Sequence, residues 1–314
     1  MIYLDHNATT QPDPAVCDAV DQVNRELWAN PSSAHRFGQT IRQRVEIARQ
    51  QLAELIHTKP AQLLFTSGGT ESNNLALNGT LATARQPAVL STAVEHAAVR
   101  EPVAALQKRG ITTASAALDP NGIVETEPLI QQARDLAEDH DLLFISIQWA
   151  NNETGVIQPV ETIADQLAAL RDELKQQSIR CRIVFHIDAT QAVGKLPVDV
   201  ESLGVDLLTL AAHKFHGPKG VGALYIRRGV RLTPQVIGGP QERERRGGTE
   251  NTPAIVGMGV AAELAAAFVT DQQTVARLEA MRDRFEQTVC QCLDIAAVNA
   301  GDAPRLWNTS NIAF

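Results

Sequence analysis

The sequence predicts an α/β fold, in which a mostly parallel sheet is covered by helices on both faces and is followed by a smaller second part. Up to residue 226, apolar residues at helical spacing alternate with short apolar runs of strand length, a pattern typical of parallel sheets. From about residue 251 the pattern changes to two long helices, 254–268 and 271–293. We therefore expect a large domain at 14–257, and a small domain at 258–314 together with the N-terminal segment 1–13.

Each expected element depends on a local pattern. In the helix 41–56, apolar residues recur every three or four positions and so form one face. The run 142–149 is mostly apolar and has the length of a strand covered on both faces. The other expected helices are 14–28, 71–84, 96–108 and 160–177. The other expected strands are 63–65, 88–91, 182–187, 205–210 and 221–226.

Composition and charge exclude several classes of function. The formal net charge of −8 argues against nucleic-acid binding, which requires a basic face. No run of 18 or more apolar residues occurs, so we expect no spanning helix. The N-terminus has neither the charged region nor the apolar region of a secretory signal, and a cytoplasmic protein is expected.

The four cysteines support neither a metal site nor a disulfide framework. Cys17, Cys181, Cys290 and Cys292 form no CxxC pair and no cluster with histidine at zinc spacing. Each is expected to be a reduced and mostly buried thiol.

A glycine-rich segment, 66–74, follows the strand 63–65 and leads into a helix. Glycines allow the backbone to approach an anion, and Thr70 stands where its N–H and hydroxyl can both bind phosphate. The alternative is a capped helix start that uses glycine for the turn. The segment has neither the dinucleotide fingerprint nor a Walker-type Gly-Lys-Ser/Thr.

Asp188 directly follows the strand 182–187. A carboxylate at the end of a buried strand needs a cationic partner, and a protonated pyridine nitrogen is one such partner. The alternative is an N-cap for the turn that follows.

A loop rich in glycine, histidine and lysine, 211–222, follows the strand 205–210. Lys214 at this strand end suits a Schiff-base amine, which needs a depressed pKa to react. Lys219 lies in the same loop, and the residue types alone do not choose between the two. Both could instead be solvated in a Gly/Pro turn.

Together, these motifs resemble the cysteine desulfurases of the NifS/IscS type, which are pyridoxal-phosphate (PLP) enzymes of fold type I in the class V aminotransferase family. The resemblance runs from residue 3 to 314. The segments that carry it are YLDHNATT (3–10), NPSSAH (30–35), SGGTES (67–72), EH (95–96), NNETG (151–155), HIDATQ (186–191), HK (213–214), GPKG (217–220), GG (238–239) and RGGTEN (246–251). The resemblance implies a large domain with a mostly parallel, seven-stranded sheet and a small α/β domain that is incomplete here.

The resemblance also implies roles for residues at the centre of the site. Lys214 would hold PLP as a Schiff base and carry the proton of the substrate Cα. Asp188 would pair with the pyridine nitrogen, and Gln191 with the ring oxygen. His96 would stack on the ring and take part in proton transfer. Asn152 would hold the cofactor oxygen and the amine side of the substrate.

The remaining roles concern the phosphate. Gly69, Thr70 and His213 would bind it, and Thr249 would reach the phosphate of the neighbouring subunit in an obligate homodimer. The resemblance implies no metal.

Two features depart from the family pattern. Ala211 stands where the family usually has serine or a similar hydroxyl, so one phosphate hydrogen bond is missing, a loss of about 1 kcal/mol or more. The family's nucleophilic cysteine and its carboxylate-binding arginine lie beyond the segment that matches 307–314. None of the four cysteines lies in the matching motif, so none is expected to be the nucleophile.

The implied reaction takes sulfur from L-cysteine and gives L-alanine and an enzyme persulfide. The sulfur then passes to iron–sulfur scaffolds or other acceptor proteins. One alternative keeps PLP but changes the chemistry, to a selenocysteine lyase or another class V lyase or aminotransferase. The other is a catalytically inactive PLP-binding partner protein, which the absent cysteine and arginine favour.

Overall fold

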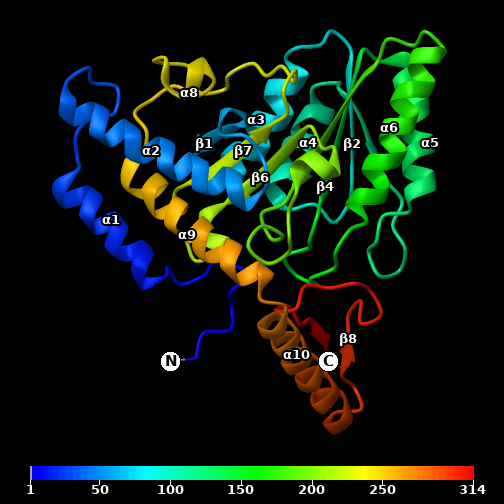
Figure 1. Cartoon of the computed structure of the whole chain (residues 1–314). Helices are drawn as coiled ribbons and strands as arrows, with labels where there is room; N and C mark the ends of the chain where they lie inside the picture. Colours follow the sequence, from blue (N-terminus) through cyan, green and yellow to red (C-terminus); the bar gives the residue numbers. More distant parts are fainter. Residues whose placement is uncertain (1) are drawn as a thin grey trace.

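A seven-stranded sheet forms the centre of the computed structural model, which describes residues 2–314 (Figure 1). Its strand order is β1-β7-β6-β5-β4-β2-β3. β7 is antiparallel to both of its neighbours, and the other pairs are parallel. The strands are β1 (Leu63–Thr66), β2 (Pro87–Ser91), β3 (Thr112–Ser115), β4 (Leu142–Gln148), β5 (Arg182–Asp188), β6 (Leu207–Ala211) and β7 (Gly222–Ile226). The mostly parallel sheet expected from the sequence is confirmed.

Helices cover both faces of this sheet, and strand side chains alternate between two cores. Leu63 and Phe65 point into the larger core, which is closed by α2, α5, α6 and α9, whereas Leu64 points into the smaller core under α3 and α4. The helices are α1 (Pro14–Glu26), α2 (Arg36–Leu55), α3 (Gly69–Leu81), α4 (Ala97–Lys108), α5 (Thr126–Asp139), α6 (Val160–Gln176), α7 (Val200–Leu203), α8 (Gln241–Glu244), α9 (Thr252–Thr270) and α10 (Gln272–Cys292).

The helix α9 packs against α1 and α2 and crosses the domain boundary expected at 257/258. Gly259 makes this packing possible, because a Cβ there would lie 2.7 Å from Ala48 Cα. The chain leaves the large domain only after Thr270, where α10 begins. By length and composition α9 could cross a membrane, and half of its apolar window is buried in the protein. The sequence-based exclusion of any such helix was therefore too broad.

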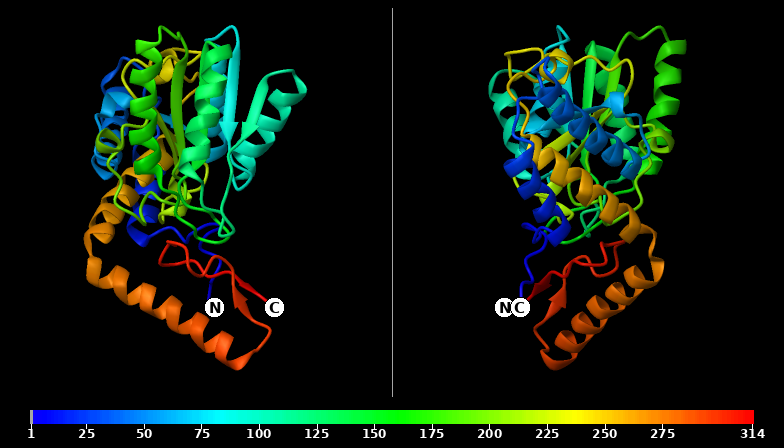
Figure 2. Two further views of the ribbon diagram at one scale, coloured as in Figure 1. Left: turned by 90° about the vertical axis from the view of Figure 1, so that its right-hand side faces the viewer. Right: turned by 60° about the vertical axis from the view of Figure 1, so that its left-hand side comes forward.

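The last part of the chain extends away from the sheet (Figure 2). It consists of α10 and a two-stranded sheet of β8 (Ala297–Val298) and β9 (Ile312–Ala313). The segment before β9 returns to the large domain, where Leu306 N donates to Gly155 O (2.8 Å) and Ile157 N to Pro304 O (2.8 Å). This return brings the segment that contains Thr309 next to the cavity described below.

Candidate active site

A cavity of about 500 Å³ lies at the carboxyl ends of β4, β5 and β6, where parallel sheets place their ligand sites. The structure brings eight of the nine predicted site residues together in its wall. These are Gly69, Thr70, His96, Asn152, Asp188, Gln191, His213 and Lys214. The N-terminal segment, including Asp5 and Asn7, also lines the cavity.

Lys214 lies just beyond the end of β6, and its amine points to the N-terminal segment. Its Nζ donates to the backbone carbonyls of Asn7 and Ala8, the latter at 2.9 Å. Burial lowers the pKa of Lys214, against the opposing charges of Asp188 and Asp5. A lowered pKa leaves more of the amine neutral at physiological pH, as a nucleophilic lysine requires.

Asp188 ends β5 with only 2% of its surface exposed. Its Oδ2 accepts a hydrogen bond from Asn73 Nδ2 (2.7 Å), and its Oδ1 accepts one from Thr190 N (3.0 Å). Each carboxylate oxygen therefore has a fixed donor, and the carboxylate still faces the cavity. Asn73, on α3, was not among the predicted residues.

The far end of the cavity suits an anion. α3 begins at Gly69, and its N-cap Gly68 (φ 151°) has no side chain that could bond the free N–H groups of the first turn. Gly222 leaves room for this turn, because a Cβ there would lie 2.8 Å from Gly68 Cα. Nearby, the buried Thr190 Oγ1 has no hydrogen-bond partner within residues 2–314. These groups form a cradle that a phosphate would fill.

His213 lines the same cavity as a neutral imidazole. Burial, followed by the charges of Lys214, Lys219 and Lys195, lowers the pKa of His213 to about 4. Its Nδ1 lies 3.1 Å from Thr9 Oγ1. At neutral pH it would therefore contribute a hydrogen bond rather than a positive charge.

Gln191 joins the cavity to a buried lysine that sequence reasoning did not assign. Gln191 Nε2 donates to Asn7 O (2.8 Å), while Lys195 Nζ donates to Gln191 Oε1 (2.7 Å) and to Gln191 O (3.1 Å). Burial, followed by the charge of Lys214, lowers the pKa of Lys195 to about 7. The sequence signal was a lysine four residues after Gln191.

Glu95 is a second buried group without an assigned role. Its Oε1 accepts hydrogen bonds from Gln148 N (2.7 Å) and Thr92 Oγ1 (3.0 Å). Burial, and then the charge of Asp188, raise the pKa of Glu95 to about 8, so its neutral form dominates at pH 7. The Glu95–His96 pair stands in the motif, but the sequence gives no reason for a buried carboxyl.

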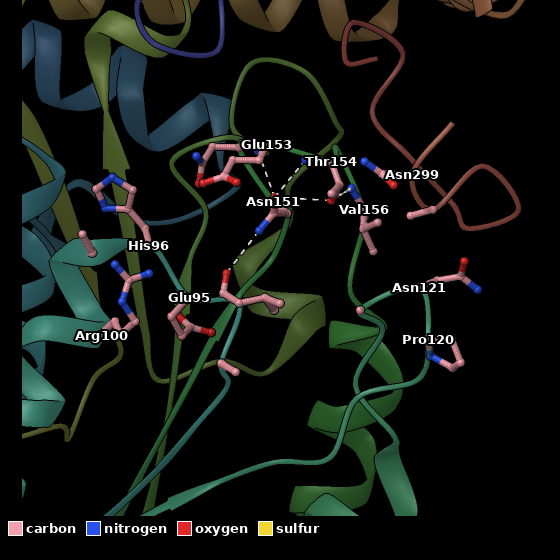
Figure 3. Close-up of a pocket in the computed structure, with 16 residues that line it drawn as sticks. Glu95, His96, Arg100, Pro120, Asn121, Asn151, Glu153, Thr154, Val156 and Asn299 are labelled. Carbon is pink, nitrogen blue, oxygen red and sulfur yellow. Dashed lines mark hydrogen bonds between the residues drawn. The ribbon is translucent and has the colours of Figure 1, made fainter. Parts of the chain in front are cut away.

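His96 lines both this cavity and a neighbouring one of about 580 Å³, whose lining residues Figure 3 shows. Its Nδ1 accepts from Ala98 N (3.1 Å) and so caps α4. Across the second cavity, Asn151 Oδ1 accepts from the backbone N of Glu153 (2.9 Å) and of Thr154 (3.0 Å), which holds the loop. The same loop carries Asn152, whose Oδ1 accepts from Gln148 Nε2 (3.1 Å).

Thr249 is the one predicted residue that lies outside the cavity. It is exposed and lines a separate pocket of about 230 Å³ together with Arg246. Arg246 pairs with Glu71 (2.9 Å). Within one chain, Thr249 thus stands apart from the residues predicted to bind phosphate.

The cysteines differ from the sequence expectation. Cys17 and Cys292 are exposed and Cys181 and Cys290 are half-buried, so none is a buried thiol. Cys17 lies on α1, and Cys290 and Cys292 lie on α10. On such helices the exposure of a side chain depends on which face of the helix it occupies. None of the four lines the cavity.

The chain matches the family model described as aminotransferase class V over residues 2–312. It is 41% identical to cysteine desulfurase 2 of Trichormus variabilis, covering all of this chain and 74% of that protein. It is 39% identical to the cysteine desulfurase NifS of Azotobacter vinelandii with the same coverage. Among solved structures, a NifS-like protein has a TM-score of 0.89 at 34% identity, covering 100% of this chain and 82% of the other. The NifS-like protein from Rickettsia africae has a TM-score of 0.86 at 29% identity, covering 99% and 81%.

Proposed function

We propose PLP-dependent cysteine desulfurase chemistry for this chain, which belongs to the class V aminotransferase family and to its cysteine desulfurases. One observation carries the proposal. A single cavity holds a lysine amine, a buried carboxylate and the uncapped start of a helix. Those are the three groups needed for the aldehyde, the pyridine nitrogen and the phosphate of PLP.

The described residues fit this cofactor. When bound, PLP supplies an electron-poor ring that accepts the electron pair left at the substrate Cα. Lys214 would hold the cofactor covalently and then carry the Cα proton, because burial lowers the pKa of its amine. Asp188 would keep the pyridine nitrogen protonated, with its own oxygens fixed by Asn73 and Thr190.

The neighbouring groups would orient the ring and its phosphate. Gln191 would bond the ring oxygen, His96 would stack on the ring, and Asn152 would bind on the amine side of the substrate. Gly69 and Thr70 would bind the phosphate with His213. Ala211 adds no hydroxyl there, and its Cβ lies 3.7 Å from the ideal Cβ position of Gly69.

We further propose a cytoplasmic homodimer that passes sulfur to acceptor proteins such as iron–sulfur scaffolds. Thr249 supports the dimer, because it is exposed and lies outside the cavity of its own chain, so a contact with the PLP phosphate would have to be made to a partner's cofactor. Sedimentation should show a dimer, and Thr249→Ala should weaken PLP binding without unfolding the chain. A monomer that binds PLP tightly would contradict the proposal.

Turnover by the 314-residue chain itself should be very low. The reaction needs a thiolate that attacks the sulfur of the substrate, and no cysteine of this chain lines the cavity. This observation favours a second candidate, a PLP-binding protein without desulfurase turnover. Alanine formation from L-cysteine, measured at full cofactor occupancy, separates the two candidates.

The proposed function is tested by measuring PLP binding through the visible absorbance of the bound cofactor. The unmodified chain should bind PLP and change its spectrum slowly when L-cysteine is added. Lys214→Ala should lose the visible band of the lysine-bound cofactor, whereas Lys219→Ala, at an exposed position in the same loop, should keep it. No visible band in the unmodified chain would reject PLP as the cofactor. Comparison with L-selenocysteine tests the selenocysteine lyase alternative.

A further inference from the structure

Lys195 is a buried lysine without a carboxylate partner among the described residues. Only 5% of its surface is exposed, and its hydrogen bonds go to two oxygens of Gln191. An ammonium group placed out of water is costly unless an anion compensates its charge. The positive charge of Lys214 repels it and, after burial, contributes to its lowered pKa.

The contact with Lys195 decides which way the Gln191 amide faces. In its charged form Lys195 has three donors and no acceptor, which matches the amide oxygen of Gln191 at 2.7 Å from Lys195 Nζ. The NH₂ group of Gln191 is then directed away from Lys195, where it donates to Asn7 O (2.8 Å). Gln191 and Asn7 both line the cavity, so the contacts with Lys195 and Asn7 together hold Gln191 with its NH₂ group on the cavity side.

We propose that Lys195 is a positioning residue, which holds Gln191 as a donor to the negative ring oxygen of PLP and places a compensating cation behind it. The inference rests on the proposed function, because it requires PLP in the cavity. The negative ring oxygen of PLP would then compensate the positive charge of Lys195, with the side-chain amide of Gln191 hydrogen-bonded between the two. Lys195 itself does not bind the cofactor aldehyde, since it does not line the cavity, whereas Lys214 does.

The alternative is that Lys195 has only a structural role and stabilises the turn between Gln191 and Lys195. Both roles would make Lys195→Met less stable, so stability does not distinguish them. The chemical identity of the ligand does. If Lys195 acts on the ring oxygen, its removal weakens only a ligand that carries this oxygen.

The experiment compares PLP with its 3-deoxy analogue, which lacks the ring oxygen. Dissociation constants are measured by equilibrium dialysis for the unmodified chain, Lys195→Met and the matched control Lys175→Met, an exposed lysine on α6. Lys195→Met should weaken PLP about 10- to 100-fold, as expected for a hydrogen bond to a charged group. It should leave the analogue within about 2-fold. Lys175→Met should change neither.

Equal weakening of both ligands, or no weakening of PLP, would overturn the inference. If Lys195→Met does not fold, the neutral Lys195→Gln replaces it in the same comparison. In a Gln191→Ala background, either substitution should add little further loss, because interacting residues are not additive. If the unmodified chain binds neither ligand, the proposed function is rejected. If Lys195→Met still prefers PLP over the 3-deoxy analogue as strongly as the unmodified chain does, only this inference is rejected.

Discussion

Two consecutive helices of similar length, α9 and α10, have opposite surroundings. Nine of the 19 residues of α9 are buried, and the helix packs against α1 and α2, whereas Glu286 is the one buried residue among the 21 of α10. Apolar side chains of the last part of the chain are correspondingly exposed, including Met281 (53%), Phe285 (55%) and Ile295 (73%). The part of the chain that carries the cavity therefore has its own core, and the part after Thr270 does not.

The last part is held by Leu306, which is fully buried in the larger core, and by polar contacts. Glu286 and Arg305 form a bidentate ion pair with both side chains nearly buried (2.8 Å for each bond). Arg282 Nη1 donates to Leu306 O (2.7 Å). Asn308 Nδ2 then reaches Asn7 Oδ1 (3.1 Å) at the cavity. Changes in α9 should thus act on the whole fold, and changes in α10 should act locally.

The largest effect on stability should come from removing the buried methionine of α9, compared with an exposed methionine of α10. Met258, on α9, is fully buried, and Met258→Ala should lower the free energy of unfolding by about 2–5 kcal/mol. Met281→Ala is the matched control on the exposed face of α10 and should cost less than about 0.5 kcal/mol. Denaturant unfolding measures both. Similar losses at the two positions would mean that α10 packs against something in solution.

The ion pair of α10 predicts a local pH dependence. Burial opposes ionisation of Glu286, but the hydrogen bonds from Arg305 and Ser310 outweigh it and lower its pKa below the ordinary 4.5. The stabilisation is therefore fully present above pH 4.5 and is lost as the pH falls through the lower folded-state pKa. Glu286→Gln should remove about 1.5–3 kcal/mol of local stability at pH 7.

Limited proteolysis of α10, compared at pH 7 and at acid pH with a protease active at both, checks this dependence. The unmodified chain should become more sensitive in acid, and Glu286→Gln should be sensitive at both values. If α10 is cleaved equally in the two proteins at pH 7, the ion pair does not hold it.

The smallest effect is expected at a cysteine of the peripheral part. Cys290 is half-buried on α10 and does not line the cavity, so Cys290→Ser should change stability by less than about 0.5 kcal/mol. It should also leave PLP binding and any alanine formation unchanged. A clear fall in alanine formation would identify Cys290 as a nucleophile that reaches the site.

Site residues were easiest to predict from the sequence where a buried apolar strand is followed directly by a polar residue. The position of Asp188 followed from a buried strand that ends in a polar residue, whereas the choice of Lys214 over Lys219 came from the family resemblance. β3 was not predicted because Thr112–Ser115 is a short, largely polar edge strand without an apolar run. α5 was also missed, although its buried Leu129 and Ala133 do show helical spacing.

Groups that depend on contacts between distant segments could not be predicted. Asn73 meets Asp188 across 115 residues, and Asn7 meets Lys214 across 207. Glu95 and Lys195 look like surface residues in the sequence, and only the packing around them shows that they are buried. The reach of Thr249 across a subunit interface likewise stays a prediction.

Lys214 is expected to be the amine that holds PLP. This assignment is tested most directly by borohydride reduction of the PLP-loaded chain, followed by mass spectrometry of its peptides. One pyridoxyl group per chain is expected, attached to Lys214, and none in Lys214→Ala treated in the same way. Attachment to Lys219 or Lys195, or no attachment to the loaded chain, would contradict it.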